Sequence, residues 1–339
     1  MIPPSFSEIE EAAQRIAGTL RLTPMLEHDR LNRFIGGRVL VKAEGLQVTG
    51  SFKARGVWNR LATLSADEKA RGVVCFSSGN HGHAVAWAAR RIGCQAIVVM
   101  PNDAPEVKCE SVRAYGADVL TYDRKAQDRE SVVRELVENR DLTFIPPYDD
   151  RRIIAGAATL AREAVFQARE LGTSPDAMIV SCGGGGLAAG SCLSLKSLCP
   201  EAECWAVEPI GYADTTRSLE LGQRVRNTSN PATICDALLA PTPGELTFSI
   251  NRELLSGAIT ISDEEVKVAM RVAAKLFGIV SEPGAALPLA AVLSKKFDVR
   301  DRQVVVVLSG SNVAPSLFAN ALESTIDPLC GAAVAEEIQ

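Results

Sequence analysis

Short apolar runs alternate with longer amphipathic segments along most of the chain. The apolar runs have the length and the β-branched content of buried strands. They lie at 73–76, 96–100, 118–122, 143–145, 177–181, 204–208 and 304–309. Between them, apolar residues recur at helical spacing over 84–92, 105–115, 129–139 and 154–170. Apolar strands separated by helices predict an α/β fold with two open, mostly parallel twisted sheets that are flanked by helices.

The order of these segments predicts two domains. Residues 72–149 form a smaller block, and residues 1–71 together with 150–339 form a larger one. No linker rich in Pro, Gly and Ser separates the blocks, so we expect them to touch and to enclose an active-site cleft. Ligands of open α/β sheets bind beyond the carboxyl ends of the strands. We therefore inspect the loops that follow the predicted strands, after Phe76, Ser181, Glu208 and Leu308.

Composition and charge narrow the choice of partners. The net charge is −5, and acidic and basic residues are mixed throughout the 339 residues, which argues against a nucleic acid or an anionic membrane as a partner. The sequence has no run of about 18 apolar residues that would span a bilayer, and its N-terminus shows no signal peptide. The nine cysteines include no CxxC pair, so we expect reduced thiols and a cytoplasmic location.

The segment SCGGGGLAAG, Ser181 to Gly190, places four adjacent glycines between a buried strand and a helix of small residues. Glycines let backbone N–H groups approach an anion closely and adopt positive φ angles, and the helix N-terminus behind them adds a favourable dipole. A tight strand-to-helix turn alone needs fewer glycines than this. The segment therefore predicts a phosphate-binding loop.

Two common phosphate motifs fit this loop unequally. A P-loop needs a lysine, but the residues after Gly186 are Leu-Ala-Ala-Gly-Ser. A dinucleotide fingerprint can be forced onto these glycines, with Glu208 at the end of the next strand as a candidate partner of a ribose, but the motif lies in mid-chain. A nicotinamide-dependent oxidoreductase therefore stays open as an alternative, although it leaves Lys53 and Asn80 without a role.

Three other segments offer chemical groups. Lys53 follows a Gly-Ser-Phe turn and opens a helix-like run, where it is either a nucleophile or an ordinary solvated cation. The loop SSGNHGHA, residues 77–84, offers hydroxyls, an amide and N–H groups that suit a carboxylate or a hydroxylated ring. The strand 304–309 ends in Ser309, whose hydroxyl could face a ring nitrogen or merely cap the next segment. His81 and His83 lack a nearby acid or cysteine, so a structural role suits them better than metal binding.

Read together, these segments resemble a known family. The motifs GSFKARG, SSGNHGHA, CGGGGLAAG, SEPGAA and LSGSN, in this order and spacing, are similar to those of the fold type II pyridoxal-phosphate enzymes, in particular the serine and threonine dehydratases and serine racemase. The likeness runs from about residue 20 to 315. It implies pyridoxal 5′-phosphate as the cofactor, a lyase activity on amino acids, and a homodimer.

The resemblance also implies roles for individual residues. Lys53 would be the Schiff-base lysine and the base that takes the α-proton of the substrate. The substrate carboxylate would bind the loop from Ser78 to Gly82, which contains Gly79 and His81. A neutral Ser309 at the pyridine nitrogen would favour β-elimination, and so dehydration of a β-hydroxy-α-amino acid such as threonine or serine. The other residues expected to contact the cofactor are Phe52, Asn80, Gly183, Gly184, Gly185, Gly186 and Leu187.

Departures from the family pattern bear on the substrate. Pro146, Ala157 and Ala158 stand where relatives carry a histidine, a glutamine and a glycine, which suggests room for a bulkier, more apolar substituent, as in 3-phenylserine. Arg129 aligns with a family arginine that could receive a second carboxylate, which keeps 3-hydroxyaspartate open, although a solvated surface cation is an equal interpretation. Ser78 stands where family racemases carry the acid or base of the opposite ring face, so serine racemase is a further alternative.

The resemblance further implies a cation site in the segment EPIGYAD. Its ligands would be the carboxylates of Glu208 and Asp214 and the carbonyl of Tyr212, an oxygen set suited to Mg²⁺ or Ca²⁺. A solvated turn after a strand is the other interpretation of the same residues. A non-enzymatic sensor of this fold also stays open, although the retention of Lys53 argues against it.

Overall fold

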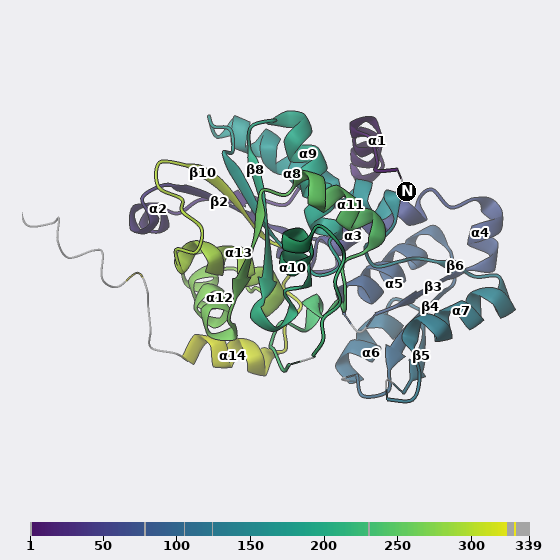
Figure 1. Cartoon of the computed structure of the whole chain (residues 1–339). Coiled ribbons are helices and arrows are strands. Elements are labelled where there is room, and N and C mark those ends of the chain that lie inside the picture. The colour runs from purple at the N-terminus through teal and green to yellow at the C-terminus, as the bar shows by residue number, and fades with distance from the viewer. Residues whose placement is uncertain are drawn as a thin grey trace, which may run out of the picture.

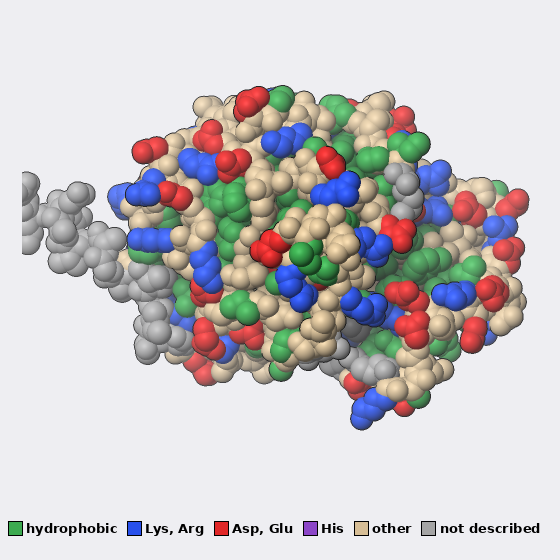
Figure 2. Space-filling view, viewed as in Figure 1, with side chains coloured by type: hydrophobic (Ala, Val, Ile, Leu, Met, Phe, Trp, Pro, Cys, Tyr) green, Lys and Arg blue, Asp and Glu red, His purple; other side chains and the backbone are tan. Residues whose placement is uncertain are grey.

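Figure 1 shows the computed structural model of the chain, in which two separate sheets are each flanked by helices. The structure describes residues 2–77, 79–104, 106–123, 125–229, 231–323 and 329. Both sheets are mainly parallel, so the predicted α/β class is confirmed. Within the described residues, no helix is both long and apolar enough to cross a membrane. On the face shown in Figure 2, acidic and basic side chains are interspersed.

The larger sheet has six strands. They are β1 (Met25–Leu26), β2 (Arg38–Ala43), β7 (Ala177–Ser181), β8 (Glu203–Pro209), β9 (Gly257–Ile261) and β10 (Gln303–Leu308). Their order is β1-β2-β10-β7-β8-β9, and only the β1–β2 pair is antiparallel. Strand β10 lies beside β2, with Val304 opposite Val39, although the two strands come from opposite ends of the chain.

Helices cover both faces of this larger sheet. They and their neighbours are α1 (Phe6–Ile16), α2 (Asp29–Ile35), α8 (Arg151–Glu170), α9 (Gly186–Leu198), α10 (Asp214–Leu221), α11 (Glu245–Leu254), α12 (Asp263–Phe277), α13 (Pro283–Leu293) and α14 (Pro315–Glu323). Val304 of β10 packs in the core with α12 and α13, whereas Val305 packs in the core with α8 and α9. Successive side chains of a strand point to opposite faces, so a strand covered on both sides is apolar throughout.

The smaller sheet lies entirely within residues 72–149. Its strands are β3 (Val73–Phe76), β4 (Ala96–Pro101), β5 (Asp118–Tyr122) and β6 (Thr143–Phe144), in the order β5-β4-β3-β6 and all parallel. The helices around it are α4 (Ala66–Arg71), α5 (Asn80–Ile92), α6 (Glu106–Arg113) and α7 (Arg129–Arg140). This sheet lies within the residues of the predicted smaller block. That the block is a separate, mobile domain is a prediction.

Helix α3 (Lys53–Leu61) lies between the two sheets. It packs against α8 of the larger half and against α5 of the smaller half (Figure 1). Three short 3₁₀ helices complete the elements: η1 (Glu44–Leu46), η2 (Ile210–Tyr212) and η3 (Asp236–Leu238). The residue that opens α3 is therefore placed where the two halves meet.

Most predicted elements are observed, and the exceptions have physical reasons. Strands β3, β5 and β7 have the predicted bounds, and α8 begins three residues earlier than expected, at Arg151. The sequence analysis missed β2, in which the buried Lys42 interrupts the apolar pattern, and β9, in which most residues are only partly buried.

Candidate active site

Lys53 stands at the carboxyl end of the central strand β10. The loop before it is fixed to this strand end, because Ser51 forms a bridge with Gly310 and the Phe52 N–H donates to the Ser309 carbonyl over 3.0 Å. The Lys53 Nζ donates to the Pro147 carbonyl over 2.6 Å. Burial of the amine lowers the pKa of Lys53 to about 8, against the attraction of Glu282, which raises it. A large share of Lys53 is therefore neutral near pH 8.

The four glycines join β7 to the start of α9, and the turn has no room for side chains at Gly184, Gly185 and Gly186. A Cβ at Gly184 would lie 2.2 Å from the ring of Tyr148, and Gly185 has a φ of +93°. The carbonyls of Gly184 and Gly185 are held by Thr247 (2.7 Å) and Asn251 (3.3 Å) of α11. The N-terminus of α9 behind this turn is an anion-binding arrangement.

One narrow cavity brings some of the predicted site residues together, whereas Asn80, Ser309 and Gly183 to Gly185 are not among the residues that line it. Its walls are formed by Phe52, Lys53, Gly56, Val57, His81, Pro147, Ile153, Ala157, Gly186 and Leu187. The predicted nucleophile therefore shares this cavity with the end of the glycine turn, where α9 begins at Gly186. The Phe52 ring centroid lies 5.3 Å from the Lys53 Nζ. Residues from the segment before α3, from α5, from α8 and from α9 meet at this point.

Asn80 opens α5 and joins the two halves of the molecule. Its Nδ2 donates to Glu282 Oε1 over 2.6 Å, and its Oδ1 accepts from Asn312 Nδ2 over 2.7 Å. Glu282 is buried, and this burial raises its pKa to about 8. The sequence analysis missed Glu282, although the carboxylate in the apolar segment SEPGAA was a signal that could have indicated it.

The loop before Asn80 is only partly described, because Ser78 lies outside the described residues. The Gly79 N–H donates to Ser77 Oγ over 3.1 Å, and a Cβ at Gly82 would lie 3.0 Å from the Val98 side chain. His81 is buried, and its Nε2 donates to the Ile145 carbonyl over 2.9 Å. Burial lowers the pKa of His81 to about 3, so the ring is neutral and its Nδ1 is an acceptor.

Ser309 is buried directly after β10, and its carbonyl accepts the Phe52 N–H. Its place at the strand end, beside the loop that carries Lys53, agrees with the predicted side of the cavity. Its role toward a ring nitrogen stays a prediction.

Arg129 is the first residue of α7, and its guanidinium lies over the ring of Phe76, with Cζ 4.6 Å from the ring centroid. Phe76 ends β3, and the proposed carboxylate loop follows it directly. Burial raises the pKa of Tyr148, and the charge of Arg129 acts in the opposite direction. Tyr148 was missed by the sequence analysis, because only its tertiary contact with the glycine turn reveals it.

Pro146 is partly buried in the segment before Tyr148.

The proposed cation ligands lie next to one another after β8. Glu208 is buried and accepts the N–H groups of Thr215 and Thr216, each over 2.8 Å. Asp214 accepts from Asn227 Nδ2 over 2.8 Å, and its buried Oδ2 has no partner among the described residues. Tyr212 is buried in η2. Among the described residues, here as elsewhere, no three His, Cys, Asp or Glu side chains are grouped so that they could hold a metal ion.

Comparison with known proteins decides which family this site represents. Residues 16–310 match the family described as pyridoxal-phosphate dependent enzyme. The chain belongs to this family. Its dependence on pyridoxal phosphate follows, and the nicotinamide alternative has no support left.

Several members of the family are similar over nearly their whole length. An L-threo-3-hydroxyaspartate ammonia-lyase of Saccharomyces cerevisiae is 36% identical over 96% of this chain and 99% of its own. A serine racemase of Dictyostelium discoideum is 39% identical over 94% of this chain and 98% of its own. The structure of a maize serine racemase superposes with a TM-score of 0.88 at 31% identity, covering 95% of this chain and 97% of that one.

Proposed function

We propose that this chain is a pyridoxal-phosphate-dependent dehydratase that converts a β-hydroxy-α-amino acid to a 2-keto acid and ammonia. The observation that carries the proposal is Lys53, an enclosed amine with its pKa lowered to about 8, in one cavity with Gly186 and Leu187 of the glycine turn. Lysines near neutrality serve as nucleophiles and bases toward carbonyl and imine groups. The names of the similar proteins support the same reaction type.

The residues present fit the cofactor. The glycine turn leaves no room for any Cβ beside Tyr148, and it places the N-terminus of α9 toward the cavity, as a phosphate requires. Gly183 to Gly186 and Leu187 would hold this phosphate, and Phe52 would pack beside the ring. Asn80, oriented by Glu282 and Asn312, would donate a hydrogen bond from its second N–H.

When bound, pyridoxal phosphate would draw electron density from the α-carbon of an attached amino acid. Lys53 would hold the cofactor and, as a neutral amine, take the α-proton. The loop through Gly79 and Gly82 would bind the α-carboxylate with its N–H groups. His81 cannot act as an acid near neutral pH, because its ring is neutral and its only N–H is held by Ile145. The narrow cavity would limit the access of water to the reacting carbon.

The experiment for this proposal supplies the purified protein with pyridoxal phosphate and a panel of L-threonine, L-serine, 3-phenylserine and 3-hydroxyaspartate. Keto acid and ammonia released in equal amounts are expected for at least one β-hydroxy amino acid. D-serine formed from L-serine, without keto acid, would instead favour the racemase alternative. If the protein forms no product from any of the four amino acids, the proposal is refuted.

Arg129 favours an acidic substrate as the second candidate. Its guanidinium lies over Phe76, beside the loop proposed for the α-carboxylate. A cation in this place could pair with the β-carboxylate of 3-hydroxyaspartate. Two hydroxyaspartate ammonia-lyases and a β-hydroxyaspartate dehydratase among the similar proteins support this choice. The cavity that Ala157 lines is narrow, so 3-phenylserine gains no support from Pro146 and Ala157 and stays a prediction.

We also propose a divalent cation at Glu208, Asp214 and the carbonyl of Tyr212. The unpartnered buried Oδ2 of Asp214 supports it, whereas the contacts of Glu208 with the start of α10 offer a structural role for that carboxylate. A chelator should lower the melting temperature of the wild-type protein, and Mg²⁺ or Ca²⁺ should restore it. The Asp214→Asn variant should respond to neither.

Three broader expectations complete the proposal. The half of the molecule within residues 72–149 would act as a smaller domain that closes over the substrate, and the enzyme would be a homodimer in the cytoplasm. The cysteines in the described part of the chain are all unpaired, which supports a reducing compartment. Sedimentation of the purified protein at several concentrations tests the dimer.

A further inference from the structure

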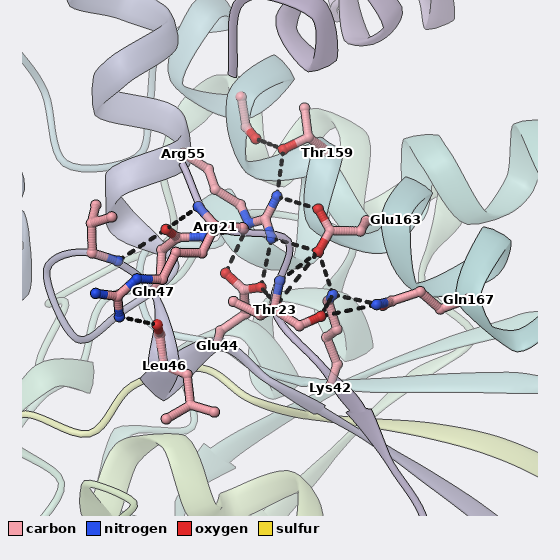
Figure 3. Close-up of polar contacts among 12 residues, drawn as sticks. Arg21, Thr23, Lys42, Glu44, Leu46, Gln47, Arg55, Thr159, Glu163 and Gln167 are labelled. Carbon is pink, nitrogen blue, oxygen red and sulfur yellow. Dashed lines mark hydrogen bonds and ion pairs between the residues drawn. The ribbon is translucent and has the colours of Figure 1, made fainter. Parts of the chain in front are cut away.

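A buried ion pair between Glu44 and Arg55 joins the two ends of the segment that carries Lys53. Arg55 Nε donates to Glu44 Oε2 over 2.8 Å, and its Nη2 donates to Glu44 Oε1 over 2.7 Å. Both side chains are completely buried. Figure 3 shows the two planar groups side by side. Parallel contacts of this kind fix direction as well as distance. The segment from Glu44 to Arg55 is therefore a loop whose two ends are held together.

A second carboxylate joins this pair to the long helix α8. Glu163 accepts from Nη1 and Nη2 of Arg55, each over 3.0 Å (Figure 3). Glu163 also pairs with Lys42, which donates to the Thr23 carbonyl over 2.7 Å. Two cations, Lys42 and Arg55, thus balance two carboxylates, Glu44 and Glu163. We call these four residues the ion cluster.

The ion cluster needs an explanation other than stability. Buried ion pairs stabilise a fold no better than well-packed apolar residues of similar volume, because desolvation of the charges offsets their attraction. They do hold groups in one defined arrangement. The location of the cluster indicates which group is held, since Arg55 is only two residues after Lys53 on α3. Residues two apart on a helix point to nearly opposite sides. Lys53 therefore faces the cavity while Arg55 faces α8.

The first turn of α3 has little other support on its own. Its N-cap residue Phe52 makes no side-chain capping bond, and the Arg55 N–H bonds back to the Phe52 carbonyl over 2.9 Å. Behind this turn, α3 and α8 are in backbone contact, because a Cβ at Gly156 would lie 2.5 Å from the Arg55 carbonyl. The carboxyl end of β10 fixes the side of this turn that carries Phe52. The ion cluster fixes the opposite side, which carries Arg55.

We propose that Arg55 is a positioning residue: by binding Glu44 and Glu163 at once, it sets how deeply the Lys53 amine enters the cavity. This inference rests on the proposed function only in that Lys53 is the reactive amine. It predicts that loosening Arg55 lets water reach Lys53. Since burial lowers the pKa of this amine, water would raise it and make the amine less reactive near neutral pH.

Arg55→Lys is the decisive variant, because it keeps the charge and removes the planar group that binds two carboxylates. The full chain, freed of cofactor, is labelled with trace acetic anhydride across pH 6 to 11, and the Lys53 peptide is quantified by mass spectrometry. The labelling profile of Lys53 should move up by about one pH unit, so that labelling at pH 7 falls about tenfold. The Arg55→Lys variant keeps Glu282 and His81, the charged and titratable groups that face Lys53.

Lys42→Met is the matched control. Lys42 belongs to the same ion cluster and is equally buried, but it contacts Glu163, Gln167 and Thr23 and not α3. It should lower the melting temperature like Arg55→Lys and leave the Lys53 profile in place. If both variants lose equal stability and neither changes the pH profile of Lys53 labelling, Arg55 has only a structural role and the inference is overturned.

Two further measurements separate the possible failures. Should Arg55→Lys not fold, Glu163→Gln leaves the contact with Glu44 and should move the Lys53 profile in the same direction by less; an unchanged profile would overturn the inference. Pyridoxal phosphate followed by borohydride should modify Lys53 in the wild-type protein. If it does not, the proposed function fails, while the acetic anhydride profiles still decide the role of Arg55.

Discussion

The two sheets differ in how firmly their helices are packed. In the larger half, twelve of the twenty residues of α8 are buried, and β7 is buried along its whole length. In the smaller half, α7 buries only Val133, and the edge strand β5 has no buried residue. Elements with few buried apolar contacts open locally at low free energy. Lys53 and the glycine turn are thus on the firm side, and Arg129, which would meet the substrate, is on the looser side. Asn80 belongs to the smaller half but begins α5, of which seven of the thirteen residues are buried.

This contrast suggests that the two halves of the molecule have different roles in the reaction. Lys53 and the glycine turn must keep one geometry through every reaction step, whereas the loop after Phe76 must admit and release the substrate. Substitutions on the firm side should therefore affect turnover and cofactor binding, and substitutions on the looser side should affect substrate affinity.

The largest effect is expected from Lys53→Ala on the firm side. It removes both the covalent attachment of the cofactor and the base, so turnover should fall about 10⁴-fold or more. Steady-state release of keto acid and the visible absorbance of the bound cofactor measure this loss. Lys69→Ala on α4, outside the cavity, should keep both signals. A Lys53→Ala protein that retains turnover would break the assignment of the site.

Gly185→Ala tests the glycine turn. A side chain at a φ of +93° costs about 1–2 kcal/mol, and its Cβ would lie 2.8 Å from Asn251 Nδ2, which adds strain. We expect a total loss of about 3 kcal/mol in unfolding free energy and a weaker affinity for pyridoxal phosphate. Gly172→Ala is the control, because its φ is +75° in open space. An equal loss of cofactor affinity in both variants would contradict a special role for the turn.

Arg129→Met tests the looser side. Loss of a charged partner should raise the KM for 3-hydroxyaspartate about 10- to 100-fold, the equivalent of about 1.5–3 kcal/mol, with little change in kcat. The KM for L-serine, which lacks a second carboxylate, should stay nearly the same. Arg134→Met on the exposed side of α7 is the matched control. If Arg129→Met changes the KM for both substrates alike, the arginine does not bind the β-carboxylate.

The smallest effect concerns acid stability of the looser side. The unfolded chain binds a proton at His81 below pH about 6.5, whereas folded His81 has its pKa lowered to about 3. Protons therefore favour the unfolded chain, and stability should fall by a little over 1 kcal/mol per pH unit between pH 6 and 5. His83, whose pKa burial also lowers, adds in the same direction. Denaturant unfolding at pH 6 and 5 should show a smaller difference in His81→Asn than in wild type. Parallel losses in both proteins would exclude His81 as a source.

The sequence predicts the fold well wherever a strand is covered on both faces. Strands such as β3 and β7 are then apolar throughout, and a local pattern is enough to find them. Strand β2 escaped detection because its Lys42 is buried through partners that lie far away in the sequence. Burial of a charge depends on those tertiary partners, which no local pattern contains.

The site divides in the same way. Lys53 and the glycine turn lie in short motifs whose chemistry is local, so the sequence predicts them. Glu282 and Tyr148 gain their place only from contacts with Asn80 and with Gly184, made across the fold. Arg55 was visible in the motif GSFKARG, but its link to Glu163 needs α8 to pack against α3. Sequence patterns find the reactive groups, and the structure is needed for the groups that orient them.

The pairing of β2 with β10 has a consequence for the order of synthesis. Lys53 leaves the ribosome long before the strand end that fixes its loop, at Ser309 and Gly310, is made. Contacts of such long sequence separation form slowly, because the chain between them must first be brought together. The smaller sheet, contained within residues 72–149, can complete its strand pairing while the chain still grows. A nascent chain would therefore gain its proposed substrate-facing half before its proposed cofactor site, and that site would be complete only after Ser309 and Gly310 have been made.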